Sequence, residues 1–160
     1  MLKEILKILE NDPRISLKQI ATMTGLSVEE VGRLIQQAEK DRVILRYKTV
    51  INWDKVSEEQ VWALIGVKLI PQKDVGFDSI AEQIYRFPQT RTVYLISGNV
   101  DLIVIVCGKS AREIANFVSE KLAGIEGVQE TITQFVLKRY KEDGEIIDGK
   151  EEVKRQRVVM

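Results

Sequence analysis

The sequence predicts an α+β protein in which a small helical domain precedes a β-α-β-β-α-β domain. Three observations lead to this prediction. Apolar residues recur at helical spacing through residues 1–41. From residue 61 onward, apolar runs of strand length alternate with amphipathic runs of helix length. Between these regions the segment WDKVSEEQ, residues 53–60, is polar and charged, as is typical of a linker.

Three helices are expected in the first domain. The segment LKEILKILE, residues 2–10, places its apolar residues on one helical face. Pro13 ends this helix, because proline disfavours helical geometry at the residue before it. A second helix fits residues 16–23, where Ser16 caps the first turn, and a third runs over residues 28–41.

The second and third helices are joined by a sharp turn at Gly25, since glycine adopts positive φ at no steric cost. Ala21 is small enough to let two helices cross closely, and Val31 anchors the third helix. The spacing Ala21-x3-Gly25-x5-Val31 is the packing skeleton of a helix-turn-helix. The same pattern also fits a three-helix bundle that binds no nucleic acid, because a fold does not fix a function.

The third helix has a buried and an exposed face. Its buried stripe consists of the apolar residues Val31, Leu34, Ile35 and Ala38. The residues expected to face outward are Ser27, Glu29, Gly32, Arg33, Gln36 and Gln37. Arginine pairs with guanine or phosphate and glutamine with base edges, so this face is a candidate DNA-contacting surface. Glycine inside this helix either allows close approach to a groove or is a tolerated surface residue.

Two glutamates open this helix, although DNA is a polyanion. Ser27 and Glu30 have the spacing of a capping box, and acids in a first turn complement the helix dipole. Glu30 therefore belongs to the chemistry of the helix start. Glu29 lies on the exposed side, where it repels phosphate or accepts a hydrogen bond from a cytosine amino group. We expect Glu29 to restrict the DNA sequences that are tolerated.

Basic residues near these helices are candidate phosphate contacts, which position a protein on DNA without specifying sequence. They are Arg14, Lys18, Arg46 and Lys48. For each of them, a solvated surface charge is the alternative. The run VILRYKTVINW, residues 43–53, is rich in β-branched and aromatic residues. It is expected to form a strand that trails the three helices, as in a winged helix-turn-helix.

The second domain is expected to hold four strands and two helices. The strands are residues 61–70, 90–97, 100–107 and 128–140, and the helices are residues 74–87 and 110–125. The order β-α-β-β-α-β is that of ferredoxin-like domains. Ser110 and Glu113 have the spacing of a capping box at the second helix.

The first of these strands is apolar on both faces, with Trp62, Leu64 and Ile70 opposite the alternate apolar residues. Two helices cover only one face of a four-stranded sheet. A second apolar face left in water usually marks an interface, and the same face of another copy is the simplest cover. This predicts a two-fold dimer; the alternative is that the linker and tail cover the face.

The amino-acid composition limits the classes of protein to which this chain can belong. The 160 residues are 44% apolar and 30% charged with a net charge of zero, which suits a globular protein without a uniformly basic surface. The apolar runs are too short for a membrane span and the N-terminus lacks a secretory signal, so we expect a cytoplasmic protein without membrane partners.

The chain has no histidine and one cysteine, which leaves no common general base and no pair of zinc ligands. No nucleophile-elbow, P-loop or dinucleotide-binding motif is present. We therefore expect no enzyme activity, no metal and no cofactor. Cys107 ends the run LIVIVC and is expected to be a buried structural residue.

The segments NDPRISLKQIATMTGLS and VGRLIQQAEKDRVILRYKTVINW resemble the DNA-binding domain of the Lrp/AsnC family of transcription regulators. SGNVDLIVIV and GIEGVQETITQFVLK resemble stretches of that family's C-terminal ferredoxin-like domain. The resemblance covers about residues 1–142 and implies an amino-acid-binding domain that assembles the protein into dimers, often octamers built from dimers. Leu34, Ala38 and Arg42 stand where the family often has arginine, leucine and glycine, which indicates a divergent DNA target.

The resemblance also implies that an effector lies between subunits near the turn SGNVD. Asp101 would accept the α-ammonium group of an amino acid, and backbone N–H groups of this turn would hold its carboxylate. The candidate residues are Ser97, Gly98, Asn99 and Asp101, with Thr131 and Thr133 as candidates for a wall of the site. A Gly-Asn hairpin turn with an exposed aspartate is the alternative interpretation.

These observations predict a sequence-specific regulator that binds double-stranded DNA as a homo-oligomer under the control of an amino acid. An amino-acid sensor that no longer binds DNA is the alternative. Haem-pathway decarboxylases that resemble the family rely on histidine, which this chain lacks. The expected organisation is a DNA-binding domain at 1–52, a linker at 53–60, a ligand-binding and oligomerisation domain at 61–142, and a charged tail at 143–160. In the tail, Asp148-Gly149 fits a hairpin turn or lies in a loose extension.

Overall fold

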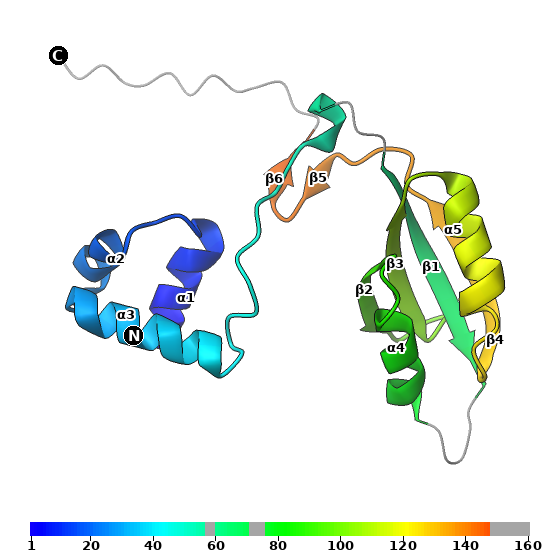
Figure 1. Cartoon of the computed structure of the whole chain (residues 1–160), viewed down its shortest axis with the longest axis horizontal. Helices are drawn as coiled ribbons and strands as arrows, with labels where there is room; N and C mark the ends of the chain where they lie inside the picture. Colours follow the sequence, from blue (N-terminus) through cyan, green and yellow to red (C-terminus); the bar gives the residue numbers. More distant parts are fainter. Residues whose placement is uncertain (57–59, 71–75, 148–160) are drawn as a thin grey trace. The chain divides into compact units, whose positions relative to one another are not determined.

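A computed structural model describes residues 1–56, 60–70 and 76–147. The chain forms two compact units, Met1–Val50 and Ile51–Met160 (Figure 1). Each unit has its own apolar core. No helix in the described ranges is long and apolar enough to cross a membrane.

The N-terminal unit consists of three helices, α1 (Leu2–Asn11), α2 (Leu17–Thr24) and α3 (Val28–Lys40). Their apolar faces meet in a core formed by Ile5, Leu9, Ile20, Ala21, Val31 and Ile35. The predicted buried stripe of α3 is confirmed for its other members, whereas Leu34 is only half-buried and packs against the edge of this core.

Each turn between the helices is specified locally. Ser16 and Ser27 each form a capping box with the residue three positions later, Gln19 and Glu30. Gly25 ends α2 in the left-handed conformation, with φ of 71°, and donates its N–H to the carbonyl of Ala21. These contacts fix the α2–α3 turn that the sequence predicts.

The end of α3 is a Schellman motif. The N–H of Val43 donates to the carbonyl of Ala38 at 2.8 Å, and the N–H of Arg42 donates to the carbonyl of Glu39 at 3.1 Å. Arg42 occupies the left-handed position of this motif, with φ of 57°. An arginine therefore stands where glycine is the usual residue.

The prediction of a strand at residues 43–53 is wrong. Residues 45–52 have no regular secondary structure, and Trp53–Lys55 form a 3-10 turn, η1. A strand requires a hydrogen-bonded neighbour, and the sheets of the described chain pair other segments. The β-branched composition of this segment therefore does not produce a strand in the single chain.

The C-terminal unit confirms the β-α-β-β-α-β order. Its first elements are β1 (Val61–Leu69), α4 (Phe77–Tyr85), β2 (Thr90–Leu95) and β3 (Leu102–Gly108). They are followed by α5 (Ala111–Phe117), a π-helical continuation η2 (Val118–Leu122), and β4 (Val128–Phe135). The strands form an antiparallel sheet in the order β2-β3-β1-β4. Several elements are a few residues shorter than predicted, most clearly α4 and β4.

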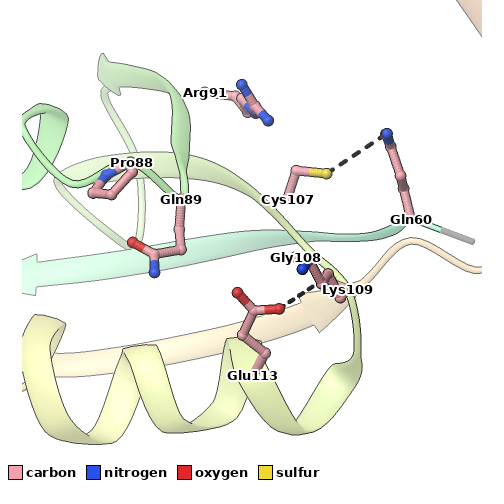
Figure 2. Close-up of a pocket in the computed structure, with 8 residues that line it drawn as sticks. All are labelled: Gln60, Pro88, Gln89, Arg91, Cys107, Gly108, Lys109 and Glu113. Atoms are coloured by element: carbon pink, nitrogen blue, oxygen red, sulfur yellow. Dashed lines mark hydrogen bonds between the residues drawn. The ribbon is translucent and has the colours of Figure 1, made fainter.

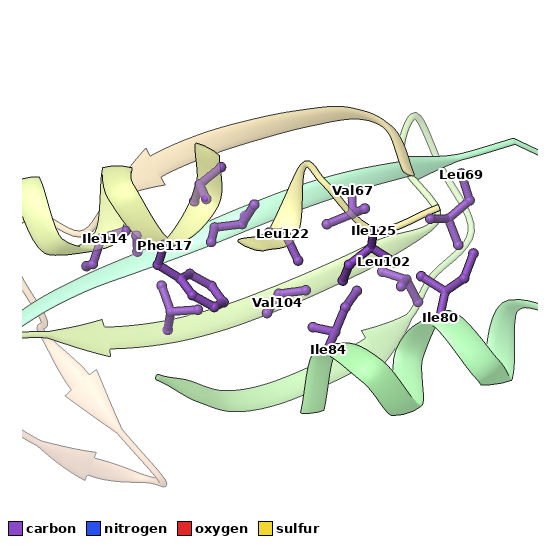
Figure 3. Packing of buried hydrophobic residues seen from close by; sticks show 14 residues of the cluster. Val67, Leu69, Ile80, Ile84, Leu102, Val104, Ile114, Phe117, Leu122 and Ile125 are labelled. Carbon is purple, nitrogen blue, oxygen red and sulfur yellow. The ribbon is translucent and has the colours of Figure 1, made fainter. Parts of the chain in front are cut away.

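One face of this sheet carries the core (Figure 3). Ile80 and Ile84 of α4 and Ile114 and Phe117 of α5 pack against alternate side chains of β1 and β3, such as Val104. The opposite face of the sheet is also apolar. Its described side chains include Trp62, Leu64, Tyr94, Ile103, Ile105 and Ile132. Tyr94 is 58% exposed and Ile132 is 45% exposed.

A short hairpin missed by the sequence analysis follows β4. It pairs β5 (Lys141–Glu142) with β6 (Glu145–Ile146). The turn residues Asp143 and Gly144 both have positive φ, as a type I′ turn requires. The turn expected at Asp148-Gly149 lies outside the described residues.

This hairpin lies beside the start of the C-terminal unit (Figure 1). The side-chain amide of Asn52 donates to the carbonyl of Ile147 at 3.2 Å. The guanidinium of Arg139 lies 5.6 Å from the centre of the Trp62 ring and 3.5 Å from the carboxylate of Asp54. Segments far apart in the sequence are thereby joined.

Candidate functional site

The exposed face of α3 presents Glu29, Arg33 and Gln36 to solvent. These residues lie within two helical turns, at spacings of four and three residues, so their side chains share a face. The capping box at the start of α3 and the Schellman motif at its end hold this helix as a rigid element. The arrangement offers one cation, one carboxylate and one amide to a partner surface.

Two predicted contact residues of α3 already have partners within the helix. The Ser27 hydroxyl accepts a hydrogen bond from the Glu30 N–H at 3.2 Å and donates to the Glu30 carboxylate at 3.1 Å. The Gln37 amide donates to the carboxylate of Asp41 at 2.8 Å. Their side chains therefore stabilise the ends of α3, and a contact with DNA would compete with these bonds.

Glu30 is a component of the helix start. Its carboxylate accepts hydrogen bonds from the backbone N–H of Ser27 at 3.1 Å and from the Ser27 hydroxyl. These bonds, with a smaller contribution from the charge of Arg33, lower the pKa of Glu30 below its usual value. The sequence-based interpretation of Glu30 as capping chemistry is confirmed.

Gly32 is not required for packing within the chain. A Cβ added there would lie 3.8 Å from the Cδ1 atom of Leu17, which is an ordinary contact distance. Any requirement for glycine at this position would therefore come from a binding partner.

The four predicted phosphate contacts are exposed. Arg14 lies in the turn between α1 and α2, and Lys18 lies in the first turn of α2. Arg46 and Lys48 flank Tyr47 in the irregular segment after α3. The Tyr47 hydroxyl donates to the Glu39 carboxylate at 2.8 Å, and burial together with this carboxylate raises the pKa of Tyr47.

Tyr47 is a residue that the sequence analysis missed. Its bond to Glu39 ties the irregular segment, which also carries Arg46 and Lys48, to the second half of α3. A tyrosine in an apparent strand gave no sign of this role, because the bond depends on the path of a segment without regular structure.

The turn after β2 places Ser97, Gly98 and Asn99 in solvent. Asp101, by contrast, forms hydrogen bonds that connect the start of β3 to β1 and to the residue that follows β2. Its N–H donates to the carbonyl of Val67, its carbonyl accepts from the N–H of Ile96, and one carboxylate oxygen accepts from the N–H of Leu69 at 2.7 Å. The carboxylate is thus held in place, with its other oxygen left to accept a further donor.

Val100 fixes the side of the sheet on which this turn lies. A Cβ added at Gly66 would be 3.1 Å from a methyl group of Val100, so the valine packs onto the glycine. Gly66 pairs with Ile103 and Ile132 on the open face of the sheet.

The predicted wall residues lie on the other face. Thr131 pairs with Val67 and Thr133 with Ile65, and both partners point into the helix-covered core. Within one chain, these threonines are not brought together with Val100.

Comparison with known proteins gives the family. Residues 2–44 match the winged helix-turn-helix DNA-binding family, and residues 62–146 match the Lrp/AsnC ligand binding domain. The chain is 45% identical to the uncharacterized HTH-type transcriptional regulator YugG of Bacillus subtilis, over 95% of this chain and 92% of the relative.

Solved structures show the same fold. An AsnC family transcriptional regulator from Agrobacterium tumefaciens superposes with a TM-score of 0.70 at 25% identity, covering 91% of this chain and 94% of the other. The transcriptional regulator NMB0573 from Neisseria meningitidis, solved as a complex with L-Met, gives a TM-score of 0.68 at 22% identity, covering 87% and 89%. With both domains matched in order along one chain, the protein belongs to the Lrp/AsnC family of transcription regulators.

Proposed function

We propose that α3 recognises operator DNA and that an amino acid bound near Ser97–Asp101 controls a homo-oligomer of this chain. The observation that carries the DNA part is the rigidly capped α3 with its exposed row of Glu29, Arg33 and Gln36. In a two-fold dimer, two such helices enter successive major grooves about 34–36 Å apart.

Different residues of this surface attract DNA and select its base sequence. Arg33 supplies a bidentate donor for guanine or phosphate, and Gln36 reaches base edges. The exposed basic residues outside α3, namely Arg14, Lys18, Arg46 and Lys48, contact phosphates and orient the protein.

The DNA proposal is tested by gel shift on the upstream region of the protein's own gene. Arg33→Ala is expected to lose affinity for this DNA by about tenfold or more, because one good bidentate contact contributes roughly 1–3 kcal/mol. Arg112→Ala, which removes an exposed arginine from α5, is the matched control. Equal, weak and strongly salt-dependent binding by wild type and Arg33→Ala would show that α3 does not recognise sequence.

The effector proposal rests on the exposed Ser97–Asn99 turn beside the fixed carboxylate of Asp101. The oxygen of Asp101 that does not contact Leu69 accepts an α-ammonium group, and N–H groups of the turn hold an α-carboxylate. The related fold of NMB0573, crystallised with L-Met, supports an amino acid as the ligand class.

The structural bonds of Asp101 decide which variant tests this site. Asp101→Ala would remove the bond to the Leu69 N–H and disturb the strand ends, whereas Asp101→Asn retains an acceptor and removes the charge. In a thermal-shift screen of the amino acids, at least one should raise the Tm of wild type, and Asp101→Asn should lose this shift. No stabilisation of wild type by any amino acid would contradict the proposal.

The proposed assembly buries the open face of the sheet against the same face of a second copy. Tyr94 and Ile132 are exposed apolar side chains on this face. Ile132→Lys is expected to shift the protein toward monomer in sedimentation velocity. Tyr85→Lys removes an exposed aromatic ring from α4, on the covered side of the sheet, and should leave the assembly unchanged.

A further inference from the structure

We propose that Leu17 and Val28 form an apolar contact for the C5-methyl group of a thymine in the major groove, and thereby help to select the operator sequence. This inference rests on the proposed function, because it adds two specificity-determining residues to the surface with which α3 recognises DNA.

Leu17 and Val28 hold equivalent positions in α2 and α3. Each directly follows the serine that caps its helix, so each is the first helical residue after Ser16 or Ser27. The side chain of each serine accepts a hydrogen bond from the backbone three positions later, and the residue there bonds back to the serine. These capping boxes fix the backbone from which the two apolar side chains extend.

Both side chains remain partly uncovered by the N-terminal unit. Leu17 is 42% exposed and Val28 is 40% exposed, whereas Ile20 and Val31 of the same helices are completely buried. A single exposed apolar side chain is ordinary on a protein surface. Two of them at the starts of both helices of a helix-turn-helix indicate a surface that meets a partner.

Gly32 brings the two side chains into one patch on α3. Val28, Gly32 and Gln36 are spaced by four residues and therefore share a helical face. The Cδ1 atom of Leu17 lies 3.8 Å from the position that a Cβ of Gly32 would take. Leu17 thus lies one helical turn from Val28, beside a residue that has no side chain. A long side chain at position 32 would cover this area, and glycine leaves it open.

The polar residues beside the patch favour DNA as its partner. Arg33 follows Gly32 directly, and Gln36 lies one turn further along the same face. The N-terminal residues of a recognition helix contact base edges, and Val28 is the first residue of α3. Two partly exposed side chains are also too few for a protein partner, because a standard protein interface buries roughly 800 Å² on each side.

Thymine is the base that fits an apolar patch. Among the four bases, it alone presents a methyl group in the major groove, where apolar side chains contact it. The side chains of Leu17 and Val28 offer no hydrogen bond, so they cannot pair with the polar edge of another base. Burial of one methyl group should raise the affinity about fourfold. A two-fold dimer makes this contact in both half-sites.

Removal of the methyl group from DNA tests the inference without any change to the protein. Binding sites are first selected from random-sequence DNA by the full-length wild type. One selected site is then synthesised with thymine and with deoxyuridine at every thymine position, and fluorescence anisotropy measures the Kd of each. Wild type should bind the uracil site about tenfold more weakly or worse, because each half-site loses a methyl contact. Random-sequence DNA should show no such difference.

Variants assign the effect to the two side chains. The double variant Leu17→Ala, Val28→Ala should bind the thymine site more weakly than wild type, and should bind both sites with the same affinity. Val28→Ala alone should reduce the difference and should fold normally, since alanine favours a helix more than valine does. Met23→Ala removes an exposed apolar side chain from the last turn of α2 and should keep the full difference. The Tm of each variant shows that it is folded.

The outcomes separate this inference from the proposed function. Equal affinity of wild type for the thymine and uracil sites, with Arg33→Ala still weakened, would overturn the inference and leave the proposed function in place. A difference that persists in the folded double variant would also overturn it, because the methyl group would then act through DNA shape or through other residues. If the selection enriches no sequence, the proposed function fails and this inference fails with it.

Discussion

Arg42 ends α3 in a backbone conformation that costs an ordinary side chain about 1–2 kcal/mol. Its neighbours fix that conformation, since the Schellman bonds from Arg42 and Val43 to Glu39 and Ala38 require it. The sequence comparison with the family singled out this position as a missing glycine. The structure supplies the physical reason why glycine is favoured there.

Arg42→Gly should therefore stabilise the N-terminal unit by about 0.5–1 kcal/mol, the strain relieved being partly offset by the greater freedom of glycine in the unfolded chain. The measurement is the Tm followed by far-UV circular dichroism. Arg46→Gly, at an exposed position in the irregular segment without positive φ, is the control and should not stabilise. A lower Tm for Arg42→Gly would mean that the arginine side chain contributes more than its backbone costs.

Glu30 links the stability of α3 to pH. Its pKa is lowered in the folded state, so its contribution is present above the unfolded pKa and is lost as pH falls through the folded pKa. For a glutamate this window lies below about pH 4.3. Wild type should lose stability relative to Glu30→Gln across that window, because glutamine keeps the capping geometry but does not titrate. Urea titrations at several acidic pH values measure the difference, and parallel curves would contradict the linkage.

Glu29 is an exposed acid in the first turn of α3, and the capping box of the helix start is formed by Ser27 and Glu30 without it. If it faces the groove, Glu29→Ala should bind non-specific DNA more tightly and should discriminate less between operator and random sequence. Fluorescence anisotropy with both DNAs, at two salt concentrations, measures this. Unchanged affinity and selectivity would place Glu29 outside the interface.

At the scale of elements, Arg139 joins the two ends of the C-terminal unit. Its contacts with Asp54 and Trp62 hold the first residues of this unit against the segment that follows β4. The Arg139 side chain is only 15% exposed and covers the Trp62 ring, whereas Asp54 is 67% exposed. Solvent weakens an ion pair to such an exposed carboxylate, so the contact with the ring should contribute more.

Arg139→Ala should accordingly lower the free energy of unfolding by about 1–2 kcal/mol and shift the fluorescence of Trp62. Asp54→Ala should cost well under 1 kcal/mol. Chemical denaturation followed by tryptophan fluorescence distinguishes them. Equal losses in the two variants would show that the ion pair, not the ring contact, stabilises this junction.

The elements also show where sequence reasoning succeeds and where it fails. Helix starts were predictable because Ser16 and Ser27 cap through bonds to residues three positions away. The prediction of a strand at residues 43–53 was wrong, because β-branched residues favour a strand only where a neighbouring strand pairs with them. The β5–β6 hairpin lacked an apolar pattern and depends on distant contacts such as Asn52 to Ile147.

At the scale of the whole molecule, the change of apolar periodicity after residue 60 was enough to predict the order of elements and the antiparallel sheet. The surfaces around that sheet were harder to predict. Asp101 was expected as an exposed ligand, but its bonds to Val67 and Leu69 arise only once β1 and β3 are side by side. Cys107 was expected to be a buried structural residue, but it is only half-buried, because its pairing with Trp62 places it on the open face of the sheet (Figure 2).

Both tryptophans, Trp53 and Trp62, belong to the C-terminal unit, and the N-terminal unit has none. Indole emission therefore follows one half of the molecule, whereas far-UV circular dichroism is weighted toward α1, α2 and α3, which hold more helical residues than α4 and α5. Because the C-terminal core is larger, the dichroism signal should fall at a lower temperature than the emission changes. Coincident transitions would show that the two units melt as one. The unfolding of each unit can thus be followed separately in the unlabelled protein, by dichroism for the N-terminal unit and by tryptophan emission for the C-terminal unit.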